Sequence, residues 1–138
     1  MVQLTAQILT ICDFALTSQE GKLSLIGIFD RIFVNDTPTR YARFFLVAVL
    51  QGQPNTDYPV TLSIASANGE MALPEKELTI KFGTNGKANL ISDIVNLNLN
   101  HLGEYVASVK SHKKTIATTS FFVTKVNQNG TASTPLPN

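Results

Sequence analysis

The chain has 138 residues, with eleven Lys and Arg against ten Asp and Glu. Charged residues make up 15%, against roughly 25% in an average soluble domain, and hydrophobic residues make up 43%. This balance excludes a strongly basic nucleic-acid binder and a disordered chain, and a single cysteine excludes an internal disulfide or a cysteine-based zinc site.

The length is close to the commonest domain size, so we expect one core. Residues 1–126 are predicted to form a β-sandwich domain. Residues 127–138 contain one large apolar side chain and are predicted to form a flexible tail, because they cannot offset their ordering entropy. The N-terminus lacks the pattern of a secretory signal and no run is apolar enough to span a membrane. We therefore expect a cytoplasmic protein that binds no membrane.

Runs of β-branched and aromatic residues alternate with turn clusters along the chain, which is typical of an all-β sandwich or barrel. We expect about seven to eight strands, over residues 3–17, 22–33, 42–51, 60–66, 76–82, 88–100, 104–111 and 115–126. Residues 70–75 look irregular because they contain Pro74. The first half of the sixth strand is open between a strand and a helical turn. Strict alternation over residues 95–100 favours a strand.

The first three predicted strands are apolar on both faces, whereas a sandwich strand usually has one polar face. Both faces must then be covered, by a loop, a short helix or another copy of the protein. An exposed apolar face of this size marks an interaction site. We therefore expect a homodimer through this sheet, with Phe45, Val47 and Val49 as candidate interface residues. The alternative is a strongly twisted sandwich whose own loops close over the face.

Three segments carry a resemblance to a known family. They are residues 12–15 (Cys-Asp-Phe-Ala), residues 21–30 (Gly-Lys-Leu-Ser-Leu-Ile-Gly-Ile-Phe-Asp) and residues 103–105 (Gly-Glu-Tyr). In these the chain resembles a family of short bacterial β-rich proteins of unknown function, over most of residues 3–126. The resemblance implies a single immunoglobulin-like antiparallel β-sandwich and no assigned activity.

Tyr105 stands just inside a late strand, after the sharp turn expected at Gly103. A tyrosine in this position can bond its hydroxyl back to the crossing backbone, as in the tyrosine corner of Greek-key sandwiches. We therefore predict a structural role for Tyr105.

Asp13 and Asp30 interrupt apolar strands and are the most conspicuous polar candidates. If Thr17 pairs with Lys22, both carboxylates fall on one face of the hairpin, roughly 13 Å apart. That separation is too large for a glycosidase acid pair. We expect structural carboxylates that tie a loop to the sheet, with a ligand or metal role as the alternative.

No catalytic or cofactor motif is present in the sequence. Cys12 lies inside an apolar strand, where an inert buried thiol is expected, and the two histidines stand in separate predicted turns. We expect no enzyme activity, no cofactor and no metal site. A sugar or small ligand would have to contact loop residues, and the candidates are Asp36, Tyr41 and Tyr58.

These observations predict a non-enzymatic interaction or scaffold domain that self-associates through an apolar sheet face. The expected partner is a second copy of the chain, with an unidentified protein as a further possibility and no nucleic acid. The alternative is a small-ligand or carbohydrate-binding module that uses the loops between strands.

Overall fold

The computed structural model describes residues 3–126, and the predicted tail over residues 127–138 lies outside the described residues. In chain order its strands are β1 Thr5–Thr17, β2 Leu23–Ile28, β3 Arg31–Val34, β4 Thr39–Gln51, β5 Asp57–Ser66, β6 Met71–Lys81, β7 Lys87–Leu99, β8 Gly103–Ser111 and β9 Lys114–Lys125. Within residues 3–126, no helix is long and apolar enough to cross a membrane.

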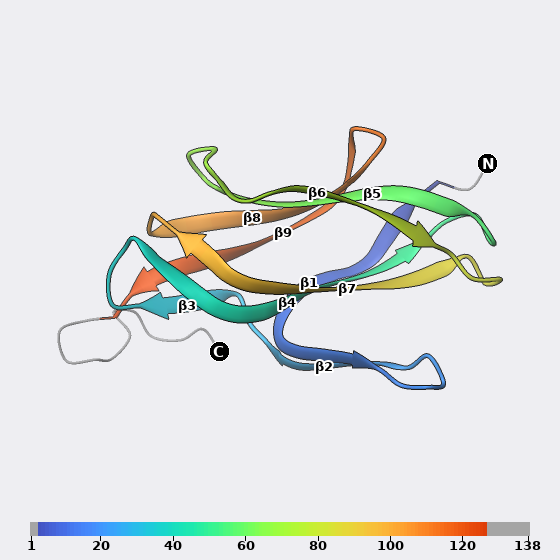
Figure 1. Ribbon diagram of the computed structural model, residues 1–138, viewed down its shortest axis with the longest axis horizontal. Coiled ribbons are helices and arrows are strands. Elements are labelled where there is room, and N and C mark those ends of the chain that lie inside the picture. Colours follow the sequence, from blue (N-terminus) through green and yellow to red (C-terminus); the bar gives the residue numbers. More distant parts are fainter. Residues whose placement is uncertain (1–2, 127–138) are drawn as a thin grey trace.

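The strands form two sheets that pack face to face (Figure 1). One sheet has the order β2-β1-β4-β7 and the other has the order β3-β9-β8-β5-β6. Neighbouring strands are antiparallel, except that β3 runs parallel to β9. β1, β4 and β7 therefore form one wall of the core, and β9, β8 and β5 form the facing wall.

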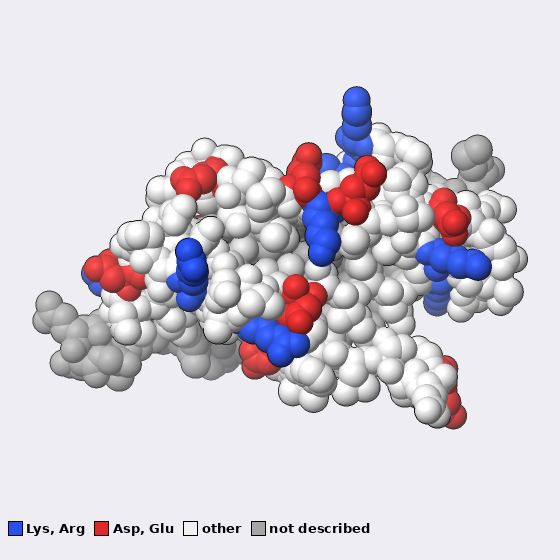
Figure 2. Space-filling view, viewed as in Figure 1, with Lys and Arg blue, Asp and Glu red and all other residues white. Residues whose placement is uncertain are grey.

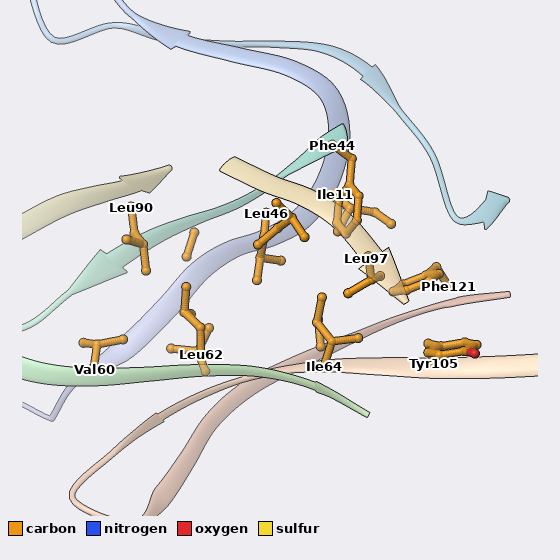
Figure 3. Packing of buried hydrophobic residues seen from close by; sticks show 14 of the residues in the cluster. Ile11, Phe44, Leu46, Val60, Leu62, Ile64, Leu90, Leu97, Tyr105 and Phe121 are labelled. Atoms are coloured by element: carbon orange, nitrogen blue, oxygen red, sulfur yellow. The ribbon is translucent and has the colours of Figure 1, made fainter. Parts of the chain in front are cut away.

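The main core lies between the two sheets and is built from alternate residues of each strand. Leu62 and Ile64 of β5 point toward Leu46 of β4 and Ile11 of β1 (Figure 3). Tyr105 and Phe121 stack with their ring centroids 5.4 Å apart at one end of this layer. All six side chains are almost completely buried, and their removal from water is the main stabilising contribution to such a fold.

The predicted strand over residues 22–33 is wrong, because the chain changes sheets in its middle. Phe29 still donates its N–H to the carbonyl of Ile11 at 3.2 Å, while the carbonyl of Asp30 already accepts from the N–H of Phe122 in the other sheet at 2.8 Å. The transfer between sheets takes two residues and divides the run into β2 and β3. The sequence gives no clear turn signal at this point, because apolar residues continue on both sides of Asp30, in β2 and in β3.

Two other predicted segments are defined by the structure. Residues 70–75 are irregular in their pairing, because the register between β5 and β6 shifts on both sides of the Ile64–Leu73 pair, although β6 begins at Met71 and continues through Pro74. Proline is tolerated there because β6 is an edge strand and needs no ladder hydrogen bond on its free side. The helical alternative for the first half of the sixth predicted strand is excluded, because Lys87–Leu99 pairs with β4 along its whole length.

Candidate functional site

The hairpin formed by β1 and β2 bends sharply at Asp13 and Gly27. The flanking pairs are Cys12 with Ile28 and Phe14 with Ile26, which places Asp13 opposite Gly27. Gly27 has a φ of +71°, a region that side chains disfavour. A Cβ atom at this position would clash with the Oδ2 atom of Asp13. Asp13 therefore packs directly over the bare glycine, and a larger residue fits this bend only if the Asp13 side chain moves.

Beyond the bend, residues 14–26 form a projecting arm that lies against the outer face of the β1-β4-β7 sheet. We call this segment the hairpin arm; it is the lowest layer in Figure 1. Its inner side chains join a second hydrophobic cluster, separate from the main core. The cluster consists of Cys12, Ala15, Phe45 and Val47, with Leu23, Leu25 and Ile91 packed against it.

This arrangement buries two of the three predicted interface residues. Phe45 and Val47 are 6% and 0% exposed, because the protein's own hairpin arm covers them, and Val49 is half-buried. Phe45 and Val47 therefore offer no free surface on the folded chain, whereas Val49 remains partly exposed. In this part of the sheet the chain closes over its own apolar face, as the alternative to a homodimer expected, and the cover is the hairpin arm.

The outer side of the hairpin arm carries the apolar surface instead. Phe14, Leu16 and Ile26 occupy positions that alternate with Ala15 and Leu25, and we call these three residues the arm face. They are 44%, 41% and 57% exposed, and Ile28, next to the bend, is 63% exposed. Phe14 lies at the edge of the arm face, because its ring also meets the ring of Phe45 edge-on. Figure 2 shows the projecting arm as an uncharged lobe with acidic atoms at its tip. Sequence reasoning missed this surface because it depends on the bend.

The structure does not bring Asp13 and Asp30 together as a pair on one hairpin. Thr17 pairs with Leu23, one residue away from the predicted register, and Asp30 lies beyond the end of β2, where the chain changes sheets. Both residues are exposed. Asp13 shapes the bend, and the backbone of Asp30 connects the two sheets.

The loop candidates do not form a common site either. Tyr41 packs between Phe29 and Phe44 at the start of β4, with ring centroids 6.1 and 5.8 Å away. Tyr58 follows the far end of β4, about 30 Å along the strand at roughly 3.3 Å per residue. Its hydroxyl accepts a hydrogen bond from the N–H of Gln53 at 2.8 Å. Both tyrosines therefore serve local packing.

Asp36, the third loop candidate, lies in the loop before β4. Its carboxylate accepts a hydrogen bond from the N–H of Thr37 at 2.9 Å and lies 3.6 Å from the amine of Lys125. These contacts tie the loop to the end of β9.

Cys12 has the surroundings of an inert thiol. Its side chain is fully buried in the second cluster, and burial is the main reason that its pKa is raised above the ordinary value. The Sγ atom contacts the carbonyl oxygen of Phe14 at 3.4 Å. A raised pKa leaves little thiolate, which is the reactive form. Among residues 3–126, no three His, Cys, Asp or Glu side chains gather into a group that can hold a metal ion.

Tyr105 bonds back to the turn that precedes β8. Its hydroxyl donates to the carbonyl of His101 at 2.8 Å and accepts from the N–H of the same residue at 3.1 Å. Glu70 holds the turn from outside, because its carboxylate accepts a hydrogen bond from Asn100 at 2.6 Å and lies 2.7 Å from the His101 ring. The hydrogen bonds from Asn100 and then His101 lower the pKa of Glu70. This is the geometry of a tyrosine corner.

Removing the Tyr105 hydroxyl tests this structural role. Tyr105→Phe is expected to lower the free energy of unfolding by about 1 kcal/mol, through the lost hydrogen bonds. Tyr58→Phe, whose hydroxyl is bonded in an exposed loop, is the matched control and should cost less. The free energies come from urea titrations of both variants. Equal stability of Tyr105→Phe and the unaltered chain would count against the corner.

Comparison with known proteins places this architecture in a family. A model described as "Family of unknown function (DUF6941)" matches residues 7–124. The chain belongs to this family. No curated protein is significantly similar to the chain. DUF6941 is a family without an assigned activity, so function has to be argued from the surface of the fold.

Several solved structures share the fold at low sequence identity. The alkylpurine DNA glycosylase AlkC from Pseudomonas fluorescens matches with a TM-score of 0.51 and 11% identity, over 87% of this chain and 30% of that chain. A β-glucosidase from Listeria innocua matches with a TM-score of 0.52 and 5% identity, over 89% and 16%. An immunoglobulin-like protein from Pseudomonas aeruginosa matches with a TM-score of 0.46 and 17% identity, over 88% and 96%.

These likenesses concern the fold alone. This DUF6941 chain spans less than a third of the length of the glycosylase and β-glucosidase chains that it matches. The predicted all-β sandwich is confirmed, with nine strands within residues 3–126 in place of seven or eight.

Proposed function

We propose that this chain is a non-enzymatic interaction domain that self-associates through the arm face. The observation that supports the proposal is the exposure of Phe14, Leu16 and Ile26 on one projecting two-stranded arm. Exposed apolar surface of this kind on a soluble domain marks an interaction site. The buried, protonated Cys12 and the family without an assigned activity agree with a binding role and not a catalytic one.

The charge distribution favours a second copy of the chain as the occupant. Between Lys22 and Asp30 the sequence has no charged residue, and the net charge of the chain is +1. Two copies therefore meet with little electrostatic repulsion, and near-neutrality promotes association. Contact between the arm faces of two copies removes apolar surface of both copies from water at once.

A lysine on the arm face tests the proposal. Ile26→Lys places a charge where an apolar side chain is 57% exposed, and it is expected to convert a dimer into a monomer. Met71→Lys is the matched control, because Met71 is 45% exposed on β6, an edge strand of the other sheet. The molar mass of each variant is measured by light scattering after gel filtration, over a range of loading concentrations.

The proposal predicts a dimer for the unaltered chain and Met71→Lys, and a monomer of 15.0 kDa for Ile26→Lys. A monomer in all three samples contradicts self-association. A dimer in all three samples supports self-association but contradicts the arm face as the contact surface.

A further inference from the structure

The two sheets have four edge strands, and β2 differs from the others. The other three carry devices that discourage pairing with another chain. β3 has four residues and begins with Arg31, β6 contains Pro74 and is rich in Glu and Lys, and β7 contains Asp93 and a positive φ at Asn96. β2 reads Leu-Ser-Leu-Ile-Gly-Ile, with no charge and no proline, and its one positive φ, at Gly27, falls after the four residues of the strand that belong to the hairpin arm.

An unprotected edge presents backbone N–H and C=O groups that another strand can pair with. In β2 these groups border the arm face, because Ile26 belongs to both. Leu23 and Leu25, at the alternate positions, pack inward against the second cluster. A strand added beside β2 therefore gains backbone hydrogen bonds and brings its own side chains against Ile26 in the same step.

We infer that two copies of the chain pair β2 against β2 in antiparallel orientation about a twofold axis. This inference rests on the proposed function and specifies its contact. The two hairpin arms then join into one layer of four strands, in which the two β2 strands lie at the centre. A twofold axis makes the contact self-complementary, so that each residue of one strand meets its counterpart from the other.

The charges at the two ends of β2 select the orientation and the register. Lys22 directly precedes β2, and Asp30 lies two residues beyond its end, where the chain turns toward the other sheet. Parallel pairing would put Lys22 beside Lys22. Antiparallel pairing with the two Ile26 residues on the axis brings each Lys22 to the end of the contact where the Asp30 of the second copy lies, so that opposite charges face each other. Lys22 has an exposed contact with Glu20 at 3.7 Å, which is long enough for the amine to turn toward the second copy.

Disulfide trapping tests the register. Directly opposed residues in an antiparallel pair have Cα atoms roughly 4.5–5.5 Å apart, within the range that a disulfide spans. Two Ser24 residues would be offset by four positions, roughly 13 Å along the strands, which a disulfide cannot bridge. The experiment uses the full chain with Cys12→Ala, so that the introduced cysteine is the only thiol. Circular dichroism melts check that each variant folds.

Ile26→Cys is expected to give a disulfide-linked dimer under mild oxidation, at least tenfold faster than Ser24→Cys or Met71→Cys. An equimolar mixture of Ser24→Cys and Ile28→Cys should form the mixed dimer, because these positions oppose each other in the same register. Ile26→Cys reacting no faster than Met71→Cys overturns the inference.

Light scattering of the unaltered chain distinguishes failure of the β2 pairing from failure of the proposed function. A dimer in which Ile26→Cys is not trapped contradicts β2 pairing but still supports self-association. A monomer contradicts both proposals.

Discussion

Phe45→Ala is expected to lower the free energy of unfolding by about 3 to 5 kcal/mol, the usual cost of deleting a buried aromatic ring. Phe45 joins the hairpin arm to the sheet. Its ring meets Phe14 edge-on with the centroids 5.5 Å apart, and the Arg43 guanidinium lies 5.2 Å from its centroid. It also packs in the cluster that buries Cys12. Without the ring, the arm loses its main contact and the thiol becomes accessible.

Two measurements check this expectation, a urea titration and the rate at which a disulfide reagent labels Cys12 in the native protein. Phe122→Ala is the matched control, because Phe122 is 43% exposed on the other sheet. It should change stability little and leave the labelling rate unchanged. Slow labelling of Cys12 in Phe45→Ala, equal to that of the unaltered chain, would show that the arm does not depend on this contact.

Gly27→Ala is expected to destabilise the protein more than Gly21→Ala, although both residues have a positive φ. An alanine in this region costs about 1 to 2 kcal/mol. At Gly21, where φ is +83°, a new Cβ meets nothing within 4 Å, so the cost ends there. At Gly27 the Cβ also meets the Asp13 carboxylate, and pushing that exposed side chain off its rotamer adds about 0.5 to 1.5 kcal/mol.

A double variant isolates the contact at the bend. Asp13→Ala removes the carboxylate atoms nearest to the new Cβ and should recover most of the additional loss in Gly27→Ala, while leaving Gly21→Ala unaffected. Urea titrations of the single and double variants give the coupling energy. Equal losses in Gly27→Ala and Gly21→Ala would mean that Asp13 moves aside and does not shape the bend.

The sequence predicted the fold class because the apolar alternation of the later strands is regular. Val60, Leu62 and Ile64 alternate with polar or small residues and point into the main core. The first strands break that rule, and the two-faced pattern correctly indicated a second buried surface. The pattern alone does not tell a second copy from the chain's own arm as the cover, because burial by either one leaves the same periodicity.

The bend and the change of sheets were beyond sequence reasoning for a physical reason. A glycine inside an apolar run, such as Gly27, is compatible with a bulge, a bend or a close approach of another residue. The choice depends on Asp13, which only becomes its neighbour when the hairpin forms. The same holds at Phe29 and Asp30, whose backbone partners lie in different sheets.

The central claim is that the arm face joins two copies of this chain, and sedimentation equilibrium of the unaltered protein tests it most directly. The account predicts a reversible species of twice the 15.0 kDa chain mass whose fraction rises with concentration. A single species of 15.0 kDa at every concentration would contradict it.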